Sequence, residues 1–385
     1  MLNALNGSLQ AELNRFFNVI DSTAISTSSV STAAFCKARK KLSHLAFKEL
    51  NNDLVNCFYE SSKLNRWKGF RLLAVDGSVT QLPVSKELLS RYGKARSHAG
   101  MPSVRLSQLY DLKNKITIDL QVESHTTGER ELALKHLNYA QKGDLIIYDR
   151  GYPAVWFYKR HMLRNIDFCM RVTLDSSNII KEFIESGEDS AIMTFPCIEK
   201  SLRRCKKDGI PTASIDLRLV RVELPTGLTE VLITSLMDEI EYPTDLFSDL
   251  YRQRWSVEED YKVMKSRLNI ENFSGISVEA VLQDIYAKLL MKNLASVTLY
   301  EAHDPTDTSR KNRKYAYKLN FTFAINMLKD NIVRFMMRIA TDNLCILLIE
   351  KISRETNAYR PNRKFARKDK RTTPNKYPMN YKRMC

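Results

Sequence analysis

Two short apolar runs, each ending on an aspartate, constrain the fold of this chain more than any other feature. The first run, LLAVDGS, reaches Asp76, and the second, LIIYDRG, reaches Asp149. Short apolar runs bounded by glycine predict buried β-strands. Taken singly, either aspartate could be a turn former, because Asp and Gly are common turn residues. Taken together, the runs predict strands that present carboxylates at their carboxyl ends, where α/β sheets collect their sites.

Strand and helix patterns alternate around these runs. Residues 103–124 predict two strands joined by the turn DLKNK, and residues 167–173 predict another strand. Residues 127–140 and 154–166 predict helices. Strands followed by a helix, a strand, a helix and a strand indicate a mixed α/β fold.

The charge of the chain limits its partners. A net charge of +16 predicts a polyanionic partner, with nucleic acid first and an anionic membrane surface second. Apolar runs such as LCILLI at 344–349 are far too short for a membrane span, and the N-terminus lacks the pattern of a signal peptide. The seven cysteines form no CxxC motif, which favours reduced thiols in a cytoplasm. The sequence therefore predicts a cytoplasmic protein that associates with nucleic acid.

Changes in composition and in the pattern of apolar residues divide the chain into six parts. The basic cluster at 37–41 could be the solvated face of an ordinary amphipathic helix or part of a module that contacts DNA. Residues 212–236 predict a hairpin around Pro225 and Gly227. The last part carries eleven Lys or Arg without periodicity, which predicts disorder. The parts are a helical DNA-binding region at 1–65, a first core part at 66–173, a β-rich insertion at 174–240, a second core part at 241–300, C-terminal helices at 301–353 and a basic disordered tail at 354–385.

The segment YRQRWSVEEDYKVMK, residues 251–265, has an unusual polar stripe. Pro243 could open a helix, and no further Pro or Gly occurs before Gly275, so one continuous helix is predicted. At about 100° per residue, four polar residues fall within an arc of about 60°. They are Tyr251, Arg254, Glu258 and Lys265. A soluble helix usually places Leu and Ile on such a stripe, so this one predicts a functional face.

Three carboxylates from separate elements, Asp76, Asp149 and Glu258, can hold two Mg²⁺ or Mn²⁺ ions. One ion would polarise an attacking water or 3′-hydroxyl, and the other would stabilise the leaving 3′-oxygen. Such chemistry depends on positioning and charge neutralisation, so cations are expected beside the carboxylates. Arg254 and Lys265 would clamp DNA phosphates, and the hydroxyl of Tyr251 would donate to one.

The spacing of the stripe resembles that of a known family. It matches the Y-x2-R-x3-E-x6-K signature of a large group of bacterial insertion-sequence transposases of the DDE type, and AVDGS and YDRGY resemble the segments carrying that group's two aspartates. The resemblance implies a ribonuclease H-like catalytic core interrupted by a β-rich insertion. It also implies metal-dependent cleavage at the ends of an insertion sequence and strand transfer into target DNA. The implied partner is double-stranded DNA, both terminal inverted repeats and target, bound by a homodimer.

Weaker candidates surround this site. Arg150, beside Asp149, could meet phosphate or form an ion pair, and Trp255 could pack or contact DNA. Some members of the group stack a flipped base on a tryptophan of the insertion; here only Phe183 or Phe195 could offer such a face. Four tail residues would add salt-dependent affinity for DNA, unless the tail serves only solubility: Arg363, Lys364, Arg367 and Lys368.

Two other functions remain open on the sequence alone. One is a transposase-derived protein that binds DNA but no longer cuts it, against which the complete set of three carboxylates argues. The other is a metal-dependent DNA nuclease without strand transfer. A basic tail and a two-metal site are equally consistent with such a nuclease. A joined product between donor end and target DNA would distinguish the transposase from the nuclease.

Overall fold

The computed structural model describes residues 9–22, 25, 30–94, 101–223, 227–303, 315–338 and 342–359. Its contacts divide the chain into two compact units. The first unit comprises Met1–Ser62, Thr80–Val104 and Lys262–Cys385. The second comprises Lys63–Val79 and Arg105–Tyr261.

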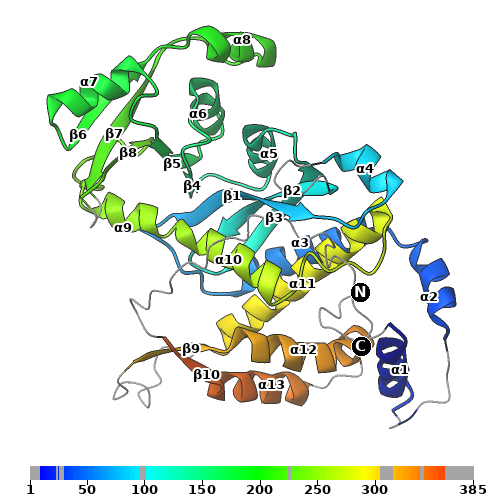
Figure 1. Cartoon of the computed structure of the whole chain (residues 1–385). Helices are drawn as coiled ribbons and strands as arrows, with labels where there is room; N and C mark the ends of the chain where they lie inside the picture. Colours follow the sequence, from blue (N-terminus) through cyan, green and yellow to red (C-terminus); the bar gives the residue numbers. More distant parts are fainter. Residues whose placement is uncertain are drawn as a thin grey trace. The chain divides into compact units, whose positions relative to one another are not determined.

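The second unit is built on an eight-stranded sheet with the order β3-β2-β1-β4-β5-β8-β7-β6 (Figure 1). Its strands are β1 (Arg71–Gln81), β2 (Ser103–Asp111), β3 (Ile116–Ser124), β4 (Asp144–Tyr148), β5 (Asp167–Val172), β6 (Ser190–Phe195), β7 (Ile215–Glu223) and β8 (Thr229–Thr234). Strands β1, β4 and β5 are parallel neighbours, whereas β8 pairs antiparallel with both β5 and β7. The predicted mixed α/β class is therefore confirmed.

A buried ion pair fixes the register of β1 against β4. Arg71 and Asp144 are partners in the ladder, and two nitrogens of Arg71 donate to the two carboxylate oxygens of Asp144 at 2.8 and 2.7 Å. Beyond this pair the two strands are apolar, and Leu72 and Ile146 are fully buried. Burial of each such side chain contributes about 1.5–3 kcal/mol, so the two aspartates stand on a rigid platform.

The two aspartates leave this platform in different ways. Asp149 directly follows the end of β4, as predicted. The prediction that the first strand ends on Asp76 is wrong, because β1 continues in extended form through Gly77 to Gln81. The physical reason is that only the pairing with β4 stops, at Ala74, while β2 still flanks β1 on its other side.

Residues 174–240 extend the same sheet. The predicted hairpin is present as β7 and β8, although Pro225 lies outside the described residues. Two helices that the sequence reading did not expect flank it, α7 (Asn178–Ser186) and α8 (Glu199–Asp208). Each ends on a glycine in the left-handed conformation, Gly187 with φ 75° and Gly209 with φ 66°, as is common at helix C-termini.

Four further helices belong wholly or largely to the second unit. Helix α5 (Glu129–His136) packs on β3, α6 (Val155–Met162) on β5, and α9 (Leu246–Arg252) on β7; α10 (Trp255–Ser266) follows α9. The predicted continuous helix is therefore wrong, since the chain turns at Gln253 and Arg254. The backbone N–H groups of these residues bond to carbonyls three residues back, at 3.2 and 3.0 Å, which tightens the chain without Gly or Pro.

The first unit is helical and centred on α11 (Val278–Glu301), which is buried along most of its length. Its other helices are α1 (Leu9–Ile20), α2 (Thr32–Arg39), α3 (Leu45–Ser61), α4 (Lys86–Tyr92), α12 (Phe321–Met336) and α13 (Asp342–Arg354). Arg39, at the end of α2, forms a buried ion pair with Asp284 of α11 at 3.0 Å. This member of the basic cluster is therefore structural, whereas Lys37, Lys40 and Lys41 are exposed.

Two short strands interrupt the helices of the first unit. They are β9 (Ala316–Leu319) and β10 (Thr356–Tyr359), which pair antiparallel. The prediction of helix throughout 243–353 is therefore wrong at β9. The predicted disordered tail begins with a strand instead, because pairing with β9 satisfies its backbone.

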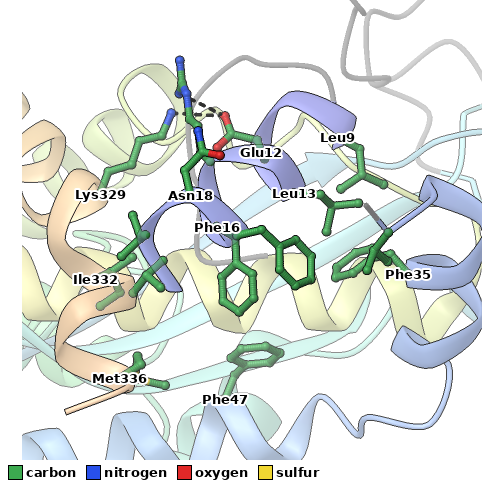
Figure 2. A pocket seen from close by; sticks show the side chains of 15 residues that line it. Leu9, Glu12, Leu13, Phe16, Asn18, Phe35, Phe47, Lys329, Ile332 and Met336 are labelled. Carbon is green, nitrogen blue, oxygen red and sulfur yellow. Dashed lines mark hydrogen bonds and ion pairs between the residues drawn. The ribbon is translucent and has the colours of Figure 1, made fainter. Parts of the chain in front are cut away.

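An apolar pocket of about 600 Å³ lies between α1, α2, α3 and α12 in the first unit (Figure 2). Phe16, Phe35, Phe47 and Ile332 are among the side chains that line it. Glu12 forms ion pairs with Lys329 at 3.4 Å and with Arg15 at 3.5 Å beside it. The pocket shows that α1 packs incompletely on its neighbours.

Candidate active site

Arg254 joins two of the predicted carboxylates. It lies in the turn between α9 and α10, and only 3% of its surface is exposed. Its Nη2 donates to Glu258 Oε1 at 2.9 Å, and its Nη1 lies 3.9 Å from Asp76 Oδ1. A single buried guanidinium therefore neutralises carboxylates from a strand and a helix.

Asp149 is held by two other side chains. Arg171 of β5 pairs with Asp149 Oδ1 at 2.8 Å, and the hydroxyl of Tyr251 donates to the same oxygen at 3.3 Å. Arg171 also pairs with Glu230 of β8. The sequence reading missed Arg171, although a lone arginine in the apolar strand DFCMRVT is a signal. Because Tyr148 pairs with Met170 in the parallel ladder, the next residues, Asp149 and Arg171, lie side by side.

The pKa values of the two aspartates are shifted in opposite directions. The pKa of Asp76 is raised to about 6, chiefly by burial and also by the charges of Glu258 and Asp149, against the lowering effects of Arg254 and of the backbone N–H of Gly77. Burial alone would also raise the pKa of Asp149. The backbone N–H of Arg150 and the guanidinium groups of Arg254 and Arg171 outweigh burial, so the pKa of Asp149 falls below its ordinary value. Asp149 is thus more firmly ionised at neutral pH than Asp76.

Tyr261 anchors α10 to the sheet. Its hydroxyl lies 2.9 Å from the backbone carbonyl of Asp76 and 3.2 Å from that of Leu106, where it can donate to either oxygen. Gln108 of β2 also donates to the carbonyl of Val257 at 3.5 Å. These contacts place Glu258 opposite Asp76. No local pattern in the sequence predicted the contacts of Tyr261 and Gln108.

The remaining predicted residues take different places. Trp255 is 53% exposed, and the guanidinium of Arg254 lies 5.4 Å from its ring centre. Arg150 is exposed and makes no ion pair with any residue that the structure describes. Lys265 belongs to the first unit, where its Nζ lies 3.9 Å from Glu271. The four tail residues, Arg363, Lys364, Arg367 and Lys368, lie outside the described residues.

Two aromatic candidates are contradicted. Phe183 and Phe195 are 1% and 7% exposed, because they pack as core residues, and the ring of Phe195 contacts that of Tyr158 in α6. Neither offers a free face for stacking a flipped base.

A buried serine, histidine and aspartate in the same unit form a chain of contacts. His136 Nε2 lies 3.0 Å from the Ser107 hydroxyl, and its Nδ1 lies 2.7 Å from Asp119 Oδ2. All three are at most 2% exposed. No substrate can reach this group, so it fastens α5 to β2 and β3.

The chemistry of the carboxylates suits a divalent cation. Their oxygens are the ligands that Mg²⁺ and Mn²⁺ prefer. Burial and, to a smaller extent, the charges of Glu258 and Asp149 raise the pKa of Asp76, and a cation would favour its ionised form. Within the described ranges, no three Asp, Glu, His or Cys side chains already lie at metal-binding spacing. Arg254 and Arg171 share the carboxylate oxygens instead, so a cation would compete with these guanidinium groups.

The described helices include none long and apolar enough to cross a membrane.

The chain is similar in sequence to transposases of insertion sequence elements. The chain is 23% identical over 274 residues to the transposase InsG for insertion sequence element IS4 of Escherichia coli (strain K12), which covers 69% of this chain and 60% of that protein. It is 24% identical over 315 residues to the transposase for insertion sequence element IS231E of Bacillus thuringiensis subsp. finitimus, which covers 71% of this chain and 64% of that protein. The chain thus spans less than two thirds of the length of either relative.

One solved structure aligns with the chain, and one family model matches more than half of its residues. A chain of the piggyBac transposase synaptic complex with hairpin DNA aligns with a TM-score of 0.42 and 11% identity, over 89% of this chain and 75% of that chain. The model of the family described as Transposase DDE domain matches residues 67–294, which include Asp76, Asp149 and Glu258. The chain therefore belongs to the Transposase DDE domain family.

Proposed function

We propose that this protein is a DNA transposase that cleaves DNA at the ends of an insertion sequence and transfers the strands into target DNA. One observation carries the proposal. Carboxylates from three separate elements of a DDE-family chain, Asp76, Asp149 and Glu258, all lie within the field of the buried Arg254. The DNA substrates would be the terminal inverted repeats of the element and a target duplex, since the named relatives serve insertion sequence elements.

The three carboxylates would bind two Mg²⁺ or Mn²⁺ ions. When bound, such ions activate the attacking oxygen and stabilise the leaving 3′-oxygen. Asp149 is suited to be the first ligand because its lowered pKa keeps it ionised. Glu258 would exchange its pairing with Arg254 for a cation, which frees the guanidinium for a phosphate.

Several cations of the chain would bind the DNA phosphates. Arg254 and Arg171 already lie beside the carboxylates, and Arg150 is exposed next to Asp149. Tyr251 carries a hydroxyl whose pKa burial raises, so it remains a neutral donor. Lys265, the last residue of the Y-x2-R-x3-E-x6-K pattern, would serve the same phosphates.

The larger organisation is proposed on the same grounds. The strand order β3-β2-β1-β4-β5, with a parallel β1-β4-β5 set, supports a ribonuclease H-like core extended by β8, β7 and β6. The helical region at residues 1–65 would bind the ends of the element through exposed lysines such as Lys37, Lys40 and Lys41. The protein would act in a bacterial cytoplasm, at the nucleoid, as a homodimer, since two ends must be joined.

An end-cleavage assay tests the proposal. Purified protein is incubated with a labelled fragment carrying the inverted repeats that flank its gene, with Mg²⁺ or with EDTA. Glu258→Gln is compared with Glu259→Gln, which changes the neighbouring, exposed glutamate of the same helix. Metal-dependent nicking at the repeat boundary, lost in Glu258→Gln and kept in Glu259→Gln, is the expected result.

The alternatives predict other products. A transposase-derived protein that only binds DNA would retard the fragment in a native gel but would not cut it in either Mg²⁺ or Mn²⁺. A nuclease would cut it but never join it to target DNA. Equal cleavage by Glu258→Gln and the wild type would remove Glu258 from the site.

A further inference from the structure

A fourth carboxylate lies beside the two aspartates. A Cβ placed on Gly151 would come within 3.2 Å of Glu129 Oε2, and one placed on Gly77 within 3.6 Å of Oε1. Gly77 directly follows Asp76, and Gly151 stands two residues after Asp149. The carboxylate of Glu129 therefore lies between the two segments that carry the aspartates, in space that glycine leaves open.

Other contacts fix the start of α5 at this place. Arg105 of β2 has its Nη1 3.5 Å from Glu129 Oε1 and donates to the carbonyl of Thr127 at 3.0 Å. Arg130 donates to the carbonyl of Tyr152 at 3.0 Å. The side chain of Glu129 nevertheless remains 41% exposed. Its carboxylate is thus held in position but keeps room to accept hydrogen bonds from solvent.

The hydroxyl of Tyr152 is a second, independent sign of a ligand here. Tyr152 is 2% exposed, and its hydroxyl has no hydrogen-bond partner among the residues that the structure describes. A buried hydroxyl in this condition costs free energy unless something else bonds it. Burial and the charges of Glu129 and Asp76 raise the pKa of Tyr152 well above its ordinary value. The group is therefore a neutral hydroxyl within the field of the site's carboxylates.

We propose that Glu129 is a positioning residue that, together with the Tyr152 hydroxyl, hydrogen-bonds the water ligands of a divalent cation held by Asp76 and Asp149. This inference rests on the proposed function, because it assumes that the two aspartates bind the cation. Mg²⁺ and Mn²⁺ keep several waters in such sites, and their protons need acceptors. Groups that orient metal ligands in this way are worth about 10–100-fold in metal affinity.

Titration with Mn²⁺, followed by the electron paramagnetic resonance signal of the free ion, tests the inference on the full chain without DNA. Glu129→Gln keeps the shape of the side chain and removes its charge. The matched control is Glu131→Gln, in the same helical turn, which is 46% exposed and pairs with Arg204 at 2.7 Å. We expect Mn²⁺ affinity to fall about tenfold or more in Glu129→Gln and to stay unchanged in Glu131→Gln.

Tyr152→Phe gives a reading that does not depend on the charge of Glu129. It removes only a hydroxyl that bonds to none of the described residues, so the melting temperature should not fall. We expect its Mn²⁺ affinity to fall severalfold. A structural role for the hydroxyl would instead lower the melting temperature and leave Mn²⁺ binding intact, which would overturn the part assigned to Tyr152.

Asp149→Asn separates failure of this inference from failure of the proposed function. If Asp149→Asn loses Mn²⁺ while Glu129→Gln binds as the wild type does, the role of Glu129 is overturned and the proposed function stands. If Asp149→Asn itself binds as the wild type does, both are overturned. Equal weakening in Glu131→Gln would also overturn the role of Glu129, because it would reflect net charge alone.

Discussion

Arg254 donates to Glu258 at 2.9 Å across one turn, from a side chain that is only 4% exposed. The same guanidinium faces Asp76, so a single buried cation compensates two carboxylates that would otherwise repel each other. Arg254 is therefore a structural residue of the site as well as a candidate phosphate ligand. Its two roles can be separated experimentally.

Replacing Arg254 should destabilise the protein. Arg254→Gln leaves Asp76 and Glu258 without their shared cation, and removing one partner of a buried pair costs about 3–5 kcal/mol. Because Glu258 is partly exposed, we expect the lower end of that range in chemical denaturation at pH 7.5 in EDTA.

Arg252→Gln is the matched control for Arg254→Gln. Arg252 lies two residues earlier and pairs with Asp249, but both side chains are about three-quarters exposed. Such pairs contribute at most about 1 kcal/mol. Equal destabilisation in the two variants would show that Arg254 does not hold the carboxylates together.

Asp76→Asn should stabilise the protein at neutral pH but not at acid pH. The folded protein raises the pKa of Asp76 from 3.8 to about 6, so it binds the proton more tightly than the unfolded chain does. Wild-type stability therefore falls as pH rises from about 4 to about 6, and the asparagine variant escapes this loss. Thermal unfolding in EDTA at pH 4.5 and pH 7.5 measures the difference, which should be on the order of 2 kcal/mol. An equal effect at both pH values would contradict the raised pKa.

Arg171→Gln should impair cleavage more than folding. It removes a cation that lowers the pKa of Asp149 and that would stabilise charge on the reacting phosphate, and loss of such a group costs about 100-fold in rate. The pH at which activity is half-maximal should also rise. Single-turnover cleavage across a pH series measures both effects. Arg164→Gln, at an exposed arginine of the same unit, should behave as the wild type.

Deleting residues 360–385 should change how binding depends on salt. The deleted segment contains Arg363, Lys364, Arg367 and Lys368, which would release counterions from DNA. We expect a shallower slope of log affinity against log salt concentration, with the slope changing by about 0.9 for each phosphate that the tail neutralises. Filter binding to non-specific duplex over a range of KCl measures it, and an unchanged slope would show that the tail serves another purpose.

The sequence was informative where one local pattern determines structure. Apolar runs located the neighbouring strands that carry Asp76 and Asp149, because burial of Leu and Ile dominates there. The break at Gln253 was not predictable from Gly or Pro, since the turn lies where Arg254 meets Asp76, a residue distant in the sequence. Arg171 and Glu129 escaped notice because strand register and helix placement, rather than local spacing, bring them to the site.

Strand β8 has a consequence for how such proteins can be rebuilt. It extends the sheet from β5, and it carries Glu230, the partner of Arg171, which in turn holds Asp149. The insertion at 174–240 therefore cannot be replaced as an independent segment, because one of its strands contributes a residue that supports the site. A chimaera that takes its insertion from another transposase would need to keep this strand and its acidic residue, as well as the pairing of Arg204 in α8 with Glu131 of α5, whereas α7 could be replaced more freely.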